Sequence, residues 1–185
     1  MNKDSTSILY DLFADLLEYP TLSTPLKSGL CYQHLQATQA EAGVLLERFY
    51  AEMEKRPLQQ LEELYTVVFD MQPVCYPYVG YQLFGESYKR GAFMAQLNEA
   101  YHAVGYSAGQ ELPDHLSVIL RFLGLDSANR EGDFCQALLR EGLTPAVEKM
   151  LQTFGTQSEN PYYSLMSALH LFLVHAPEKE LSHAR

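Results

Sequence analysis

The sequence predicts an all-α protein, a single-domain bundle of about seven to nine helices. Apolar residues recur at helical spacing along most of the chain, and no segment alternates apolar and polar residues as a strand would. Prolines and glycines separate the periodic stretches. The 185 residues are enough to bury a core, and we expect residues 1–185 to form one domain.

The first half of the chain contains three apolar stripes at helical spacing. They cover residues 8–17, 35–53 and 58–69. Ser5 or Thr6 is expected to cap the first helix. A loop is expected between the first two stripes, because Pro20, Pro25 and Gly29 fall there.

The second half of the chain continues the helical pattern. The expected helices run over residues 87–105, 113–123, 127–141, 144–154 and 162–175. Pro113 and Pro145 fit the first position of their helices, where a missing N–H costs nothing. Residues 116–123 and 162–175 are apolar on most of their circumference, so both helices should be central.

Composition and charge exclude several classes of function. The chain has 23 acidic and 13 basic residues and a formal net charge of −10, so we expect no nucleic-acid binding and favour a basic peptide as partner. No apolar run reaches the about 20 residues that span a bilayer. The chain also begins without a signal-peptide pattern, and we expect a soluble, cytoplasmic protein without membrane insertion.

No sequence pattern indicates catalysis or a bound cofactor. The chain lacks GxSxG, P-loop, GxGxxG and HExxH patterns, and its three cysteines form no CxxC pair. This cysteine usage favours a reducing compartment and no structural zinc. We therefore expect no catalytic residue, no metal and no cofactor.

An aromatic segment follows the third stripe. Between Asp70 and Gly80, Pro73 and Pro77 forbid a continuous helix. Five aromatic rings lie within 13 residues: Tyr76, Tyr78, Tyr81, Phe84 and Tyr88. Tyrosine gives contact area at low entropic cost, and carboxylates beside it attract Lys or Arg. The segment fits a groove for a basic, apolar peptide, although rings that only pack the loop onto the core would give the same pattern.

Glu111, Asp114 and His115 form a second candidate site. On a helix, positions i, i+3 and i+4 share one face. Acidic residues also favour the first turn of any helix, and this capping interpretation is the stronger one from the residues alone. Recognition of a cationic ligand, or a metal or acid–base site, remain as alternatives; zinc would need further ligands.

Three motifs occur together in this part of the chain. They are YxxxFD at residues 65–70, LFGE at residues 83–86 followed by Arg90 and Gly91, and E-x-x-D-H at residues 111–115. With the opening FADLLEYP, they resemble the TorD/DmsD/NarJ family of molybdoenzyme maturation chaperones. The resemblance spans about residues 7–125, and LFGE, KRGAF and ELPDHL are most similar to the NarJ-like branch.

The resemblance implies an all-helical cytoplasmic chaperone that is not an enzyme. Such a chaperone binds the N-terminal segment of the catalytic subunit of a molybdopterin-containing oxidoreductase, and holds it for molybdenum cofactor insertion. In TorD- and DmsD-like members the segment is a twin-arginine leader, and in NarJ-like members a leader remnant. Members can exchange helices, so we expect a monomer or a helix-swapped dimer, with candidate hinges at residues 105–112 and 155–161.

The resemblance also shifts both candidate clusters towards peptide recognition. An apolar helical segment would lie against Tyr78, Tyr81 and Leu83, and carboxylates would meet its basic residues. Arg90 is expected to pair with one of these carboxylates. The predicted peptide-binding residues are Asp70, Tyr76, Tyr78, Tyr81, Leu83, Glu86, Arg90, Glu111, Asp114 and His115.

Two alternatives belong to other functional classes. One is a metal- or His-dependent hydrolase that uses Glu111, Asp114 and His115. The other is an acidic helical adaptor unrelated to molybdoenzymes. Stoichiometric bound metal would favour the hydrolase, whereas co-purification of a cofactor-free molybdopterin subunit would favour the chaperone.

Overall fold

The computed structural model describes residues 3–71, 73–155 and 159–176. Its elements are α1 (Ser5–Leu16), α2 (Thr24–Thr38), α3 (Ala40–Lys55), α4 (Leu58–Phe69), α5 (Val79–Phe84), α6 (Tyr88–Ala103), α7 (Leu116–Leu123), α8 (Ser127–Glu131), α9 (Asp133–Ala137), the π-helix η1 (Leu138–Leu143), α10 (Thr144–Thr153) and α11 (Pro161–His175). Within these residues no strand forms and eight helices have at least seven residues, which confirms the predicted all-α fold. None of the described helices is long and apolar enough to cross a membrane.

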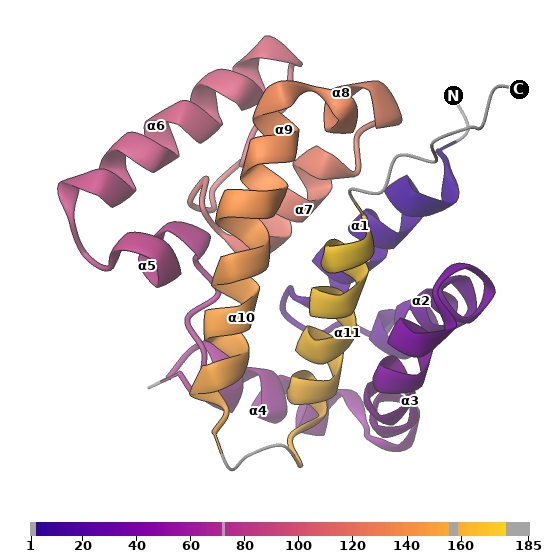
Figure 1. The fold of residues 1–185 in the computed structure, drawn as a ribbon. Coiled ribbons are helices and arrows are strands. Elements are labelled where there is room, and N and C mark those ends of the chain that lie inside the picture. Colours follow the sequence, from indigo (N-terminus) through magenta and orange to yellow (C-terminus); the bar gives the residue numbers. More distant parts are fainter. Residues whose placement is uncertain (1–2, 72, 156–158, 177–185) are drawn as a thin grey trace, which may run out of the picture.

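The helices surround α11, which lies between α3 and α10 (Figure 1). Helix α2 covers α3, and α1 packs against both α2 and α7. On the other side of the molecule, α5 packs against α10, η1 and α6. Helix α6 lies at the edge opposite α2 and α3 (Figure 1), and α5 joins it to the body of the bundle.

Helices α7 and α11 are central, as predicted. Every residue of α7 except Arg121 is buried, and α11 buries both its start and its middle. The Phe172 ring of α11 packs against Tyr10 and Phe13 of α1, with centroids 5.0 and 5.3 Å apart. The core therefore runs through α1, α7 and α11, which come from both halves of the chain.

The start of α1 is fixed by an interaction that the sequence did not predict. Asp4, rather than Ser5 or Thr6, is the N-cap, and its Oδ1 accepts the backbone N–H of Ser7 at 2.6 Å. Arg130 donates to both carboxylate oxygens of Asp4, at 3.1 and 2.9 Å. This pair fastens α8 to the beginning of α1.

Helix α2 corrects the expected loop around residues 20–29. It begins at Thr24, and Pro25 fits its first turn because a backbone N–H at that position would have no partner within the helix. The single stripe expected over residues 35–53 is divided between α2 and α3. The division falls at Gln39, which leaves the helical region at φ −145° and ψ 74°.

The C-terminal helices also differ from the prediction. The expected helix over residues 127–141 is interrupted at Gly132, which is extended with ψ 148°. The predicted break at residues 142–143 is wrong, because α9, η1 and α10 form one continuous rod. The wider π turn lies just before Pro145, which has no N–H to donate to the carbonyl of Glu141 and would crowd it in a regular turn.

The two candidate hinges stay predictions. Residues 105–112 lie in the connection between α6 and α7. In the second candidate hinge, residues 156–158 lie outside the described part of the chain.

Candidate functional site

A short β-bridge joins the two candidate clusters. Tyr78 and His115 pair in antiparallel fashion. The N–H of Val79 donates to the carbonyl of Asp114 at 2.8 Å, and a second backbone hydrogen bond of the same length closes the bridge. Helix α5 begins directly after Tyr78, in a stretch where no helix was expected. The aromatic segment and the 111–115 motif therefore form one site.

Arg90 of α6 connects this bridge to the surface. Its Nε donates to Oδ2 of Asp114 at 2.8 Å, and its Nη1 donates to Oε1 of Glu86 at 2.8 Å, so it pairs with two carboxylates. The Asp114 side chain is fully buried and that of Arg90 is 11% exposed, whereas Glu86 is 76% exposed. The hydrogen bond to Asp114 raises the pKa of Arg90. The charge of Asp114 is thus balanced by Arg90 within the protein. Asp114 does not face solvent, and it positions the Arg90 side chain.

The same guanidinium orders the tyrosines. Its central carbon lies 5.3 Å from the ring centroid of Tyr78 and 5.9 Å from that of Tyr81, within the range of cation–π attraction. Tyr76 packs against Tyr81 with ring centroids 4.8 Å apart and is 44% exposed. We call Tyr76, Tyr78 and Tyr81 the tyrosine surface.

Gly80 makes the close approach of these groups feasible. A Cβ atom on this residue would lie 2.7 Å from Oδ2 of Asp114 and 3.0 Å from Cγ of Arg90. It would also lie 3.0 Å from the ring of Phe93. Any side chain here would displace the Arg90–Asp114 pair, so the glycine is a requirement of the site.

His115 has a local structural role. It is the N-cap of α7, where its Nδ1 accepts the N–H of Ser117 at 3.2 Å, and its ring packs edge-on against Tyr78 at 5.2 Å. Burial lowers the pKa of His115, so the imidazole is neutral at pH 7. Helix α7 begins at Leu116 instead of Pro113, and the prediction that Glu111 and Asp114 occupy its first turn is therefore wrong.

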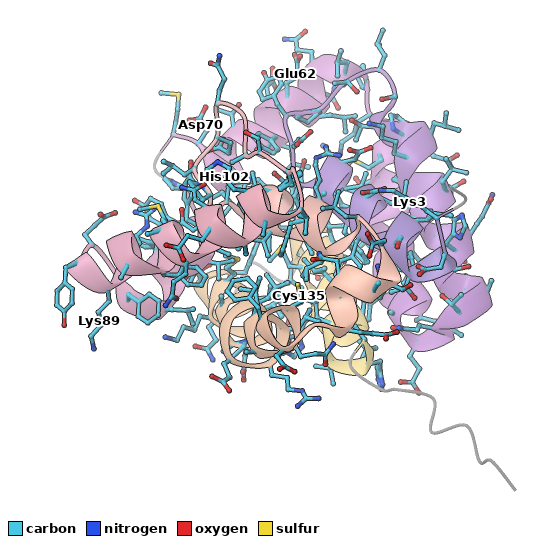
Figure 2. All side chains as sticks on the ribbon, turned by 90° about the horizontal axis from the view of Figure 1, so that it is seen from above. Lys3, Glu62, Asp70, Lys89, His102 and Cys135 are labelled. Atoms are coloured by element: carbon cyan, nitrogen blue, oxygen red, sulfur yellow. The ribbon has the colours of Figure 1, made fainter. Side chains whose placement is uncertain are left out.

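Glu111 reaches the site, whereas Asp70 stands apart. The hydroxyl of Tyr78 donates to Oε1 of Glu111 across a long 3.4 Å contact. Asp70 follows α4 and lies at the outer edge of the view in Figure 2. In the described part of the chain it makes no hydrogen bond or ion pair with the other predicted site residues. Burial first, and then the negative charges of acids that include Glu111 and Asp70, raise the pKa of Tyr65.

An apolar groove begins at Leu83, beside the tyrosine surface. It has a volume of about 600 Å³ and lies between α5 and α6 on one side and α9 and η1 on the other. We call it the apolar groove; its lining is Leu83, Phe84, Phe93, Gln96, Glu99, Ala100, Phe134, Ala137, Leu138, Glu141 and Gly142. Phe84 and Phe134 are 38% and 40% exposed.

Most of this groove was missed by the sequence interpretation, which named Leu83 as a binding residue and Phe84 only as a ring of the aromatic segment. Phe93 and Phe134 come from helices far apart in the chain, and no short motif links them. The one local signal is Phe134 itself, an apolar residue next to Asp133 in a polar stretch. One wall of the groove contains η1, and π-helical turns are frequent at functional sites.

The geometry gives little support to a hydrolase. Oδ2 of Asp114 binds Arg90, and Nδ1 of His115 faces Ser117, so both have internal partners. Among residues 3–71, 73–155 and 159–176, no group of three His, Cys, Asp or Glu side chains could hold a metal ion. Burial raises the pKa of Cys75 to about 12 and that of Cys135 to about 11, which keeps both as thiols.

Known proteins share this architecture. A crystal structure of a protein from Archaeoglobus fulgidus, assigned as a redox enzyme maturation protein, has 22% sequence identity to this chain and a TM-score of 0.63. The likeness covers 94% of this chain and 96% of that one, and it shows a common fold. Among curated proteins, no match was found.

A family match defines the class of the protein as a redox enzyme maturation chaperone of the NarJ/TorD-like type. The family model described as nitrate reductase delta subunit matches residues 33–164. The chain belongs to this nitrate reductase delta subunit family. The matched range contains the tyrosine surface, Arg90, Asp114 and every residue of the apolar groove.

Proposed function

We propose that the protein binds the N-terminal segment of the catalytic subunit of a molybdopterin-containing oxidoreductase, and holds that subunit until the molybdenum cofactor is inserted. It does so in the cytoplasm, without catalysis, as a single domain that is a monomer or a helix-swapped dimer. Membership of the maturation chaperone family supports the role. The observation that carries the proposal is the pair of ion pairs made by Arg90. They join Glu86 of the LFGE motif to Asp114 of the E-x-x-D-H motif, beside an open apolar groove.

The groove suits the apolar side of a peptide. Its volume of about 600 Å³ lies within the range of roughly 300–1,000 Å³ found for ligand pockets. The exposed rings of Phe84 and Phe134 offer apolar area that a bound helix would cover. Each Å² removed from water contributes about 25 cal/mol, before the cost of ordering the peptide is subtracted.

The carboxylates around the groove suit the basic residues of the peptide. Glu99 and Glu141 are the charged residues of its lining, and Glu86 stands exposed beside Arg90. These acids would contribute specificity and encounter rate more than affinity. Asp114 and His115 are buried, so they hold the tyrosine surface in place and the exposed residues contact the client.

Calorimetry with a synthetic client peptide tests this function. The peptide copies the N-terminal residues of the catalytic subunit of a molybdopterin-containing oxidoreductase from the source organism. Phe134→Ala and Tyr81→Ala should each weaken binding about tenfold, which corresponds to about 1.4 kcal/mol. Tyr88→Ala is the matched control, because this tyrosine is 83% exposed and lies outside the groove lining. Absence of binding by the unmodified protein, or equal losses in all three variants, would refute the proposal.

Salt dependence tests the charged part separately. The affinity should fall as ionic strength rises, because exposed ion pairs are screened. An affinity independent of salt would leave the apolar groove in place and remove Glu86, Glu99 and Glu141 from the recognition mechanism.

A further inference from the structure

A second pocket lies where the end of α1, α4 and the segment before α7 meet. It has a volume of about 420 Å³, and its walls include the rings of Tyr19, Tyr65 and Tyr106. Tyr19 is 53% exposed and packs edge-on against Tyr65, with centroids 5.5 Å apart. The hydroxyls of Tyr65 and Tyr106 donate to the backbone carbonyls of Leu17 and Val118. These bonds fix two of the three rings.

The pocket also contains a carboxylate that no cation among the described residues neutralises. Arg121 belongs to the lining, and its Nη2 lies 2.6 Å from Asp15 and 2.8 Å from Glu18. Its positive charge is therefore already paired with these two carboxylates. Glu111 has no basic partner in the described part of the chain, and its Oε1 accepts only neutral N–H and O–H donors. His115 also lines the pocket and is neutral at pH 7, so it adds no positive charge.

Two fixed tyrosine rings and the exposed ring of Tyr19, next to a carboxylate without a basic partner among the described residues, suit one ligand group in particular. A guanidinium is planar, stacks on aromatic faces, and donates two parallel hydrogen bonds to a carboxylate. An ammonium lacks the flat face and the fork of donors. The pocket therefore matches the side chain of arginine better than that of lysine.

We propose that this pocket binds one arginine side chain of the client segment, with the guanidinium against Tyr19 and Tyr65 and paired with Glu111. The inference rests on the proposed function and deepens it by assigning a basic residue of the client to a defined site. Continuity supports it, because Glu111 also contacts the hydroxyl of Tyr78 in the tyrosine surface. A segment lying across that surface therefore passes the edge of the pocket.

The first experiment uses a small probe and the whole protein. N-acetyl-arginine amide is titrated at millimolar concentrations, and the tyrosine ring signals are followed by NMR. The signals of Tyr19, Tyr65 and Tyr106 should shift saturably. N-acetyl-citrulline amide, which has the same shape without the charge, should bind at least about fivefold more weakly. The same titration is run with Nα-acetyl-lysine amide. Absence of a saturable shift in these rings, or an affinity for the citrulline or the lysine probe equal to that for the arginine probe, overturns the guanidinium assignment.

Variants with intact folds locate the contact. Glu111→Gln and Tyr19→Leu change exposed residues, and each should weaken the arginine probe by about two- to fivefold. Glu131→Gln is the control, since it removes the same net charge from an exposed position on α8 outside the lining. Equal weakening by Glu131→Gln would show that only the overall charge matters, and it would refute the site.

The client peptide separates this inference from the proposed function. Glu111→Gln should weaken the client peptide by about two- to fivefold, and should leave a version with citrulline in place of its arginine unaffected. If the peptide binds the unmodified protein but Glu111→Gln changes neither version, the pocket is refuted and the proposed function stands. If no peptide binds while the arginine probe still does, the proposed function fails instead.

Discussion

The free energy of unfolding should depend on Arg90 and Asp114 as a coupled pair rather than as two independent charges. Asp114 is fully buried, and Arg90, at 11% exposed, approaches it to 2.8 Å. Arg90→Met leaves a carboxylate inside the protein without a cation, which costs about 3–5 kcal/mol. Asp114→Asn keeps the shape and leaves Arg90 with the exposed Glu86, so we expect about 1–3 kcal/mol. The double variant leaves neither buried charge unpaired and should cost clearly less than the two single losses added together.

Urea unfolding, followed by far-UV circular dichroism at pH 7, gives the free energy of unfolding of the unmodified protein, the two single variants and the double variant. Midpoints are compared only where the denaturant slopes agree, because a change in slope reports on the unfolded state. Arg56→Met is the control, since Arg56 pairs with Glu52 on the surface of α3 and should cost no more than about 1 kcal/mol. Additivity of the two single losses within about 0.5 kcal/mol would show that the pair is not coupled, and our account of the site would be wrong.

Three further predictions use the same unfolding assay or a simple reaction. Gly80→Ala should lower the free energy of unfolding by about 1–3 kcal/mol, because its Cβ would meet Asp114. Gly91→Ala, whose Cβ meets nothing within 4 Å, should raise it by up to about 1 kcal/mol, and a loss in both would contradict this reasoning. Because burial lowers the pKa of His115, the unfolded imidazole takes up a proton first as pH falls. Stability should therefore be at its full level above pH 6.5 and decline below it until the folded pKa is passed; the decline should be shallower in His115→Asn. Cys75, with its pKa raised to about 12, should react with a thiol reagent far more slowly in the native protein than in urea, and equal rates would contradict its burial.

The helical fold was predictable because its signals are local. The stripe before Pro20 and the apolar circumference of residues 116–123 follow directly from residue spacing. The boundaries that failed depend on context. Pro25 could end a loop or begin a helix, and only packing of α2 against α1 and α3 decides between them. Pro145 likewise marks a helix start in isolation, whereas the structure carries a continuous rod past it by widening one turn.

The site was predictable only as a set of residue types. The sequence places carboxylates, tyrosines and Arg90 near each other in the chain, and the pairing of Arg90 with a carboxylate followed from charge. Which carboxylate is buried depends on the bridge between Tyr78 and His115, a backbone contact between distant segments. The walls of the groove depend in the same way on where α6 lies relative to α9 and η1, and no local pattern encodes that arrangement.

The arrangement separates residues that hold the site from residues that can meet a client. Asp114, Gly80 and His115 are buried and fix the geometry, whereas Tyr76 and Phe134 reach solvent. Loss of binding in a variant of a buried residue would therefore follow equally from local unfolding and from a lost contact. Only the exposed residues can report on recognition itself, because truncating them leaves the Arg90–Asp114 pair and the bridge intact. For this reason Phe134→Ala decides whether the apolar groove binds the client, and an Arg90 variant cannot.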